Sequence, residues 1–159
     1  MKSFTHINED NQPSMVNVGG KPSTKRLARA RTTMFLPDKV FTQLIEGEIN
    51  SPKGPVFATA IIAGTMAAKR TGDLIPFCHP IGIDSCKITI EIKEQQAYIE
   101  SCVEVEAKTG IEMEALTACS IAALTIYDMC KALSSDMIIG ATRLIEKRGG
   151  KSDFHLQDR

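Results

Sequence analysis

A long uninterrupted helix is the feature that most constrains this fold. Residues 109–133 read TGIEMEALTACSIAALTIYDMCKAL, and neither proline nor glycine occurs between Ile111 and Leu133. Thr109 and Glu112 have the spacing of a capping box, which predicts the start of the helix. Apolar residues recur around nearly the whole circumference, with alanines between them. Other parts of the structure must therefore cover this helix on most of its sides.

One polar strip interrupts the apolar surface of this helix. At about 100° per residue, four polar side chains fall within one sector: Glu114, Thr117, Thr125 and Asp128. Lys131 lies three residues after Asp128 and can pair with it. Because a covered carboxylate is costly unless it is paired or used, the strip indicates either a structural ion pair or a catalytic site.

The size and composition predict one globular domain over residues 1–159, with an irregular arm at 1–26 and a mobile tail at 147–159. Hydrophobic residues make up 43% of the chain and charged residues 24%, so a single core is feasible. We see no apolar run long enough to span a bilayer and no signal-peptide pattern, which favours a cytoplasmic protein without a membrane partner. Five cysteines without a zinc-site spacing indicate reduced thiols and no metal site.

The charges are unevenly distributed, although the net charge is zero. Residues 11–37 contain five bases and no acid, and the tail adds Lys147, Arg148 and Lys151. A neutral chain argues against a general nucleic-acid partner. The basic clusters indicate either contacts with a small polyanion or solvated faces.

The remaining periodicity predicts an α+β fold. The expected elements are a strand at 27–36, a helix at 38–46, a helix from Pro55 to Gly72, a hairpin at 84–93 and 97–107, and a strand at 137–145. This order predicts a mostly antiparallel sheet covered by helices, and a ferredoxin-like arrangement is the nearest common plan. The excess of apolar helix surface indicates a homo-oligomer.

Two further positions suggest ligand contacts. Lys53 comes just before the second helix, where free backbone N–H groups and the helix dipole favour an anion, although an exposed lysine there is also ordinary. The segment DLIPFCHP is a stiff loop, because Pro76 and Pro80 bracket His79. Three roles are open for His79: a metal ligand, a group that contacts a ligand or transfers a proton, and a structural residue held by hydrogen bonds.

Several collinear segments resemble one protein family. They are FTHIN, MVNV, KGPVFATAIIAG, DLIPFCHP, TGIEMEALTACS, ALTIYDMCKA and GGKS. Together they cover almost the whole chain and are similar to the molybdenum cofactor biosynthesis protein C (MoaC) family, the cyclic pyranopterin monophosphate synthases.

The resemblance implies a lyase. It would convert 3′,8-cyclo-7,8-dihydroguanosine 5′-triphosphate, made by a radical S-adenosylmethionine GTP cyclase, into cyclic pyranopterin monophosphate and diphosphate. It further implies a ferredoxin-like fold and a homohexamer, a trimer of dimers, with active sites between subunits. No cofactor is firmly implied, although Mg²⁺ with the triphosphate is compatible with the chemistry.

The resemblance also assigns residues. Asp128 matches the family's catalytic acid/base, and Lys53 and Lys131 match its essential lysines. The substrate-contacting segments are matched by Phe77, Cys78, His79, Met113 and Glu114.

Two positions depart from the family pattern. Asn17 stands where the family usually has aspartate, and Asp153 directly follows Gly-Lys-Ser, where a second glycine is usual. The second departure bears on any phosphate contact by Lys151. The first departure, at Asn17, motivates an alternative function, a catalytically impaired oligomeric nucleotide-binding protein on the same scaffold.

Overall fold

The computed structural model describes residues 6–157. The first five residues of the expected arm and the last two of the expected tail lie outside this range. In chain order the elements are β1 (Thr24–Phe35), α1 (Asp38–Phe41), β2 (Leu44–Ile45), β3 (Glu48–Ser51), β4 (Gly54–Pro55), α2 (Val56–Lys69), α3 (Thr71–Leu74), β5 (Ser85–Lys93), β6 (Gln96–Ala107), α4 (Glu112–Cys130), β7 (Ile138–Arg148) and β8 (Phe154–His155).

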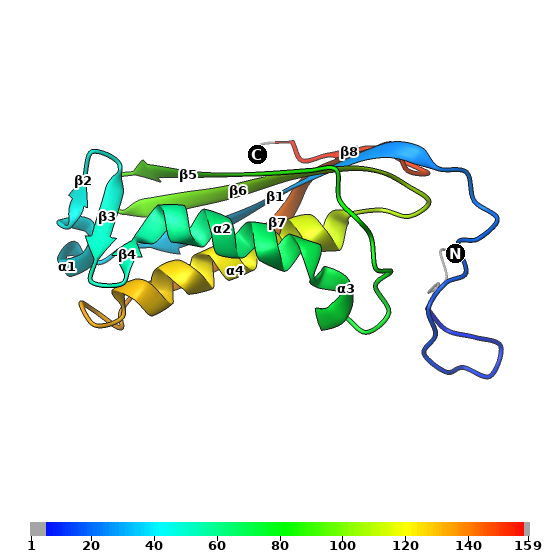
Figure 1. Cartoon of the computed structure of the whole chain (residues 1–159), viewed down its shortest axis with the longest axis horizontal. Helices are drawn as coiled ribbons and strands as arrows, with labels where there is room; N and C mark the ends of the chain where they lie inside the picture. Colours follow the sequence, from blue (N-terminus) through cyan, green and yellow to red (C-terminus); the bar gives the residue numbers. More distant parts are fainter. Residues whose placement is uncertain (1–5, 158–159) are drawn as a thin grey trace.

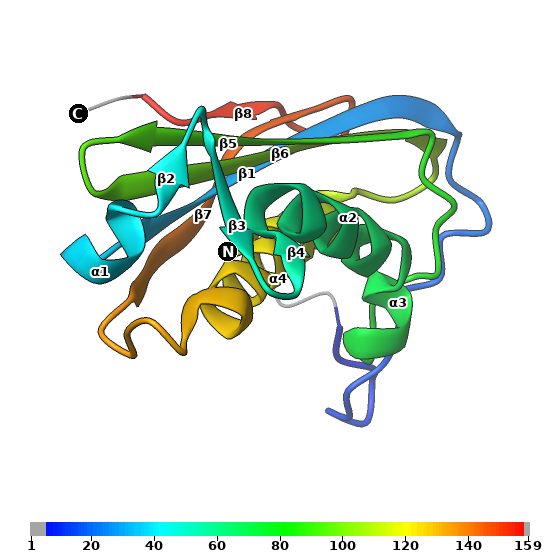
Figure 2. The same cartoon turned by 60° about the vertical axis from the view of Figure 1, so that its left-hand side comes forward.

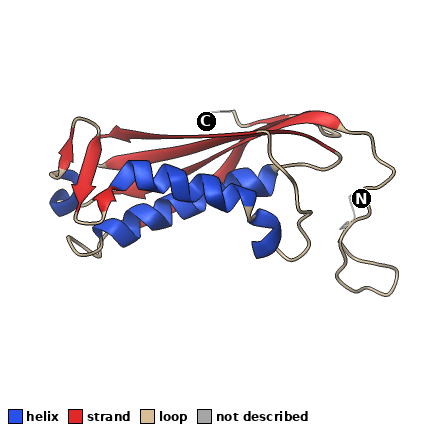
Figure 3. Ribbon diagram, viewed as in Figure 1, coloured by secondary structure: helices blue, strands red, loops and turns tan. Residues whose placement is uncertain are grey.

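The main sheet is antiparallel and has the strand order β5-β6-β1-β7-β8. The two long helices α2 and α4 lie side by side on one face of this sheet (Figures 1 and 2). The chain order β1, α2, β5, β6, α4, β7 and the pairing of β1 between β6 and β7 give the ferredoxin-like arrangement. The predicted α+β fold, with helices covering a mostly antiparallel sheet, is confirmed (Figure 3).

The core lies between the sheet and the two helices. Alternate residues of β1 face the helices, where Ala28, Ala30 and Met34 are buried, as expected for a strand with one covered face. Small residues bring α2 close to α4. A Cβ atom added to Gly64 would lie 2.7 Å from the backbone oxygen of Ala118 and 2.6 Å from Ile88 Cδ1.

The helix expected at residues 38–46 is wrong over most of its length. Only α1, four residues long, is helical, and β2 and β3 form a small hairpin after it. Glu46 and Gly47 turn this hairpin with positive φ angles of 50° and 82°. Glycine reaches this region without steric cost, so it turns the chain here instead of ending a helix.

The long helix is confirmed as α4, but its predicted cap is wrong. Ile111 occupies the N-cap position, and no side chain of the described residues caps it. Glu112 instead places Oε1 3.1 Å from Lys147 Nζ, so it links α4 to β7. The helix ends at Cys130, before the expected Leu133.

The expected arm and tail contain more regular structure than predicted. Strand β1 begins at Thr24, inside the range assigned to the arm. Strand β7 extends to Arg148, and β8 then pairs with it in the range assigned to the mobile tail.

Helix α4 is long and apolar enough to cross a membrane by length and composition alone. Within the protein it contacts α2, β1, β6 and β7. The core helix of a globular protein satisfies the same two criteria, and the contacts of α4 are those of a core helix.

The close contact of α2 with α4 generates a stability prediction. Gly64→Ala should lower the free energy of unfolding by about 1–3 kcal/mol, because the added methyl group forces the two helices apart. Chemical denaturation measures this change. Gly82→Ala is the matched control, because no atom lies within 4 Å of its added Cβ; equal losses in the two variants would contradict the packing argument.

Candidate active site

Two lysines bracket one carboxylate at the C-terminal end of α4. Lys53 Nζ lies 3.1 Å from Asp128 Oδ2, and Lys131 Nζ lies 2.7 Å from Asp128 Oδ1. All three side chains are exposed, Asp128 to 52%. The covered environment expected for Asp128 is therefore not found in a single chain. The structure brings together the three residues that the resemblance assigned to catalysis.

The two lysines tune this carboxylate. Hydrogen bonds from Lys131 and then Lys53 are the main causes that lower the pKa of Asp128. Asp128 in turn raises the pKa of Lys131, chiefly through its hydrogen bond. Both shifts favour the charged forms, so at neutral pH the cluster holds the Asp128 carboxylate next to the Lys131 ammonium group.

Lys53 lies in the turn between β3 and β4, immediately before α2. The anion site expected at the N-terminus of α2 is already filled. Glu48 Oε1 accepts a hydrogen bond from the Phe57 backbone N–H at 2.8 Å, and its Oε2 accepts one from Ala58 at 3.0 Å. Because a carboxylate of the chain itself satisfies these groups, they are not available to a phosphate.

The other predicted site residues gather at the opposite end of α4. Phe77, Cys78 and His79 lie in the loop after α3, next to the first turn of α4. Cys78 Sγ lies 3.8 Å from Glu114 Oε1. Burial is the main cause that raises the pKa of both side chains. The thiol therefore stays protonated at neutral pH and can donate to the carboxylate, rather than act as a nucleophile.

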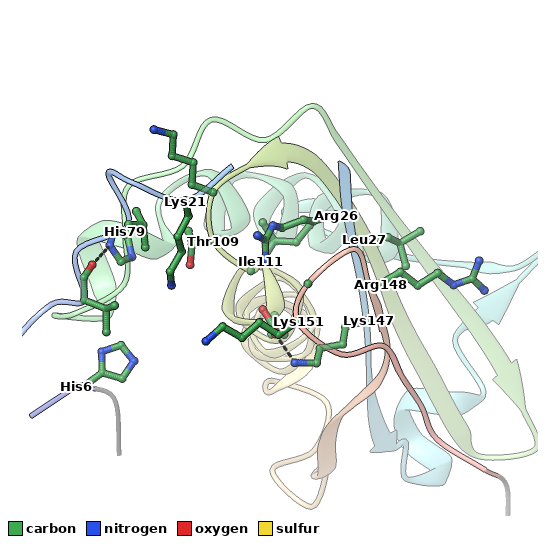
Figure 4. Close-up of a pocket in the computed structure, with 16 residues that line it drawn as sticks. His6, Lys21, Arg26, Leu27, His79, Thr109, Ile111, Lys147, Arg148 and Lys151 are labelled. Atoms are coloured by element: carbon green, nitrogen blue, oxygen red, sulfur yellow. Dashed lines mark hydrogen bonds and ion pairs between the residues drawn. The ribbon is translucent and has the colours of Figure 1, made fainter. Parts of the chain in front are cut away.

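The N-terminal arm positions the His79 ring. His79 Nε2 lies 2.7 Å from the carbonyl oxygen of Val16 (Figure 4). A carbonyl oxygen can only accept a hydrogen bond, so Nε2 must carry the hydrogen. In the neutral ring Nδ1 is then the acceptor. Lys108 Nζ also holds the arm, through a 2.8 Å hydrogen bond to the oxygen of Gly19.

Two adjoining pockets lie at this end of the molecule. An apolar pocket of about 520 Å³ is lined by His6, Ile75, Pro76, Phe77, Cys78, His79, Thr109, Gly110, Glu112 and Met113. A basic pocket of about 320 Å³ shares some of these residues and includes six cationic side chains (Figure 4). These are Lys21, Arg26, Lys108, Lys147, Arg148 and Lys151.

The basic pocket explains the uneven charge distribution of the sequence. It combines bases from the segment 11–37 with bases from the chain end, which lie next to each other because β1 pairs with β7. Sequence reasoning identified these clusters without placing them in one pocket. Lys151 lines this pocket despite the altered sequence after it.

The predicted site is divided between the two ends of α4. Asp128 follows Glu114 by fourteen residues, which corresponds to about 21 Å along a helix. Lys53, Asp128 and Lys131 line neither pocket. Glu114 is only 2% exposed and lies behind Cys78 instead of lining the apolar pocket. Within residues 6–157, no group of three His, Cys, Asp or Glu side chains is arranged to hold a metal ion.

Burial of Glu114 makes protein stability depend on pH. Because burial raises the pKa of Glu114 in the folded state, Glu114 contributes its full stabilisation at pH values below the ordinary pKa range of glutamate. This stabilisation is lost as the pH rises through the raised pKa. Glu114→Gln should therefore flatten the fall in melting temperature across this range, measured by thermal unfolding at several pH values. The exposed Glu91→Gln is the control, and an unchanged pH profile in Glu114→Gln would contradict the expected pKa shift.

Comparison with known proteins identifies the family. The chain matches the MoaC family over residues 15–150. It is 52% identical to a cyclic pyranopterin monophosphate synthase of Xanthomonas oryzae pv. oryzae, and the alignment covers 95% of this chain and 92% of that protein. The alternative of an impaired nucleotide-binding protein is not favoured by these names.

Longer relatives contain a similar segment. The chain is 50% identical to molybdenum cofactor biosynthesis protein 1 of Dictyostelium discoideum over 94% of its own length, but spans only 26% of that protein. It is 50% identical to a molybdenum cofactor biosynthesis bifunctional protein of Synechocystis sp., again over 94% of its own length, of which it spans 45%. The extent and identity of these matches establish that the chain belongs to the MoaC family.

Proposed function

We propose that this protein is a cyclic pyranopterin monophosphate synthase. It rearranges 3′,8-cyclo-7,8-dihydroguanosine 5′-triphosphate into cyclic pyranopterin monophosphate and releases diphosphate. The observation that carries the proposal is the Asp128 carboxylate held between Lys53 and Lys131. The name of the Xanthomonas relative, which aligns over nearly its whole length, supports the same activity.

The lysine–aspartate cluster suits the proton transfers of this rearrangement. Opening and reclosing the purine-derived rings requires protons to be removed and returned at several atoms. Asp128, held ionised, accepts a proton, and the ammonium groups of Lys53 and Lys131 donate one. The same cations stabilise negative charge that develops when the cyclic phosphate forms and diphosphate leaves.

The two pockets suit the two parts of the substrate. The basic pocket complements the triphosphate, because six cations line it and Glu112 is the one carboxylate of its lining. Lys147 pairs with Glu112 and Arg148 pairs with Glu146, so these two cations are already partly compensated. The adjoining apolar pocket offers Phe77 and Met113, both partly exposed, to the guanine-derived ring. His79 lies where the two pockets meet and can orient the ring through Nδ1. Any Mg²⁺ would arrive on the triphosphate oxygens, as part of the substrate.

A complete site requires two chains. The cluster at Asp128 and the pockets at the other end of α4 serve one substrate only if different copies supply them. The outer face of the helical layer is suited to such contact, since Ile62, Met66 and Leu124 are exposed there. Two chains packed antiparallel through this face would place the end of α4 that carries Asp128 against the pockets of the partner. We propose this dimer as the unit of the homohexamer.

The neighbouring steps follow from the chemistry of the substrate. A radical S-adenosylmethionine GTP cyclase would supply the cyclised triphosphate. The bifunctional name of the Synechocystis relative is compatible with the association of such activities in one chain. The proposed location is the cytoplasm.

The alternative function depends mainly on Asn17. Asn17 Oδ1 accepts a hydrogen bond from the Gly19 backbone N–H at 2.8 Å, which shapes the turn of the arm before Lys21. A carboxylate at this position would accept the same bond. The hydrogen bond of this turn therefore does not depend on the negative charge that Asn17 lacks.

Asp128→Asn tests the proposed chemistry. The amide has the same shape but cannot accept a proton, so kcat should fall by on the order of 10²- to 10⁴-fold. The measurement supplies the cyclic guanosine triphosphate intermediate and follows diphosphate release together with the fluorescent pterin formed on oxidation.

The exposed acid Glu91 provides the control as Glu91→Gln, and gel filtration shows whether assembly is retained. An active Asp128→Asn would exclude this residue as the acid/base. Tight binding of the substrate by the wild-type protein without either product would support the nucleotide-binding alternative.

Complementation tests the shared site. If different chains supply Asp128 and His79, co-expression of the inactive Asp128→Asn and His79→Ala variants should restore about one quarter of the wild-type sites. Random pairing makes about half of the dimers mixed, and one of the two sites in each mixed dimer is intact. The restored activity is measured on oligomers purified through two different tags. Co-expression of Asp128→Asn with Lys131→Met should restore no activity, because both substitutions alter the part of the site that one chain supplies. Equal activities for the two pairs of variants would contradict the shared site.

A further inference from the structure

The N-terminus of α2 is capped by a residue from a neighbouring strand. Pro55 occupies the N-cap position and has no side-chain acceptor for the first N–H groups of the helix. Glu48 of β3 replaces that acceptor. Its carboxylate receives the N–H groups of Phe57 and Ala58 at 2.8 and 3.0 Å, and that of Ile49 in its own strand at 2.7 Å.

These bonds fix the base of the turn that carries Lys53. The chain leaves Glu48 along β3, turns at Lys53 and returns through β4 into α2. Glu48 therefore joins the strand before the turn to the helix after it. Inside the turn, Ser51 Oγ accepts from the Lys53 N–H at 3.1 Å and donates to the Gly54 oxygen at 3.0 Å. The backbone of Lys53 is held from both sides.

The position of this backbone determines where the ammonium group of Lys53 can reach. The Lys53 side chain is 61% exposed, so packing constrains it little, and a lysine side chain is long and flexible. Its Nζ nevertheless lies 3.1 Å from Asp128 on α4. A shift of the turn relative to α2 would also shift Lys53 relative to α4, because α2 packs on α4.

We propose that Glu48 is a positioning residue, which holds the turn against α2 so that Lys53 reaches Asp128. Glu48 lines neither pocket and acts through Lys53 rather than on the substrate. The consequence for turnover rests on the proposed synthase activity, whereas the consequence for the Lys53–Asp128 contact does not.

Two substitutions of Glu48 separate its effects. Glu48→Ala removes all three hydrogen bonds and should lower kcat by on the order of 10²-fold with little change in KM, as expected for a misplaced catalytic group. Glu48→Gln keeps one acceptor oxygen, so its loss of kcat should be smaller. Glu91→Ala, which removes an exposed acid on β5, should retain the wild-type kcat.

The titration of Asp128 distinguishes positioning from general loss of structure. Carbon-13 NMR of labelled aspartate follows its pKa, which Lys53 lowers in the intact protein. The pKa of Asp128 should rise by the same amount in Glu48→Ala as in Lys53→Met. It should rise no further when the two substitutions are combined.

A wild-type Asp128 titration in folded Glu48→Ala would overturn the proposal. If Glu48→Ala does not fold, Glu48→Gln decides by the same titration: a partial rise of the pKa supports the proposal, and an unchanged value overturns it. If the wild-type protein has no synthase activity, the proposed function fails while the NMR result still decides the role of Glu48.

Discussion

The packing of α4 against both the sheet and its neighbour α2 is the constraint on which the rest of the structure depends. Helix α4 has four fully buried alanines, Ala115, Ala118, Ala122 and Ala123. Gly64 of α2 lets the backbones of the two helices come into contact. Both helices are thereby fixed on one face of the sheet. Because interiors of proteins are closely packed, neither helix can move independently of the other.

This packing also connects the two parts of the site. Helix α4 carries Glu112, Met113 and Glu114 at one end and Asp128 near the other, while α2 begins beside the turn that supplies Lys53. The pair of helices therefore sets the positions of Met113, Glu114 and Asp128, while Phe77, Cys78 and His79 are held in the loop after α3. The same rigidity keeps the two ends about 21 Å apart, which is why the proposed site takes its two parts from different chains.

Sequence reasoning succeeded where local pattern is strong. The alternation at 84–93 and 97–107 predicted the β5–β6 hairpin, and the uninterrupted apolar run predicted α4. It failed where a distant partner decided the outcome. Glu112 has the spacing of a helix cap but pairs with Lys147 on β7. Residues 38–46 differ for a local reason: only α1 is helical, and Gly47 turns β2 back onto β3.

The sequence by itself determined the α+β class, the family resemblance and the residue types of the candidate site. Periodicity, prolines and glycines act over a few residues, so they specify elements from local information. Only the tertiary structure decided that Lys53 meets Asp128, that Glu48 occupies the N-terminus of α2 and that two basic segments form one pocket. These arrangements join residues far apart in the chain, and their geometry depends on how the helices and strands pack.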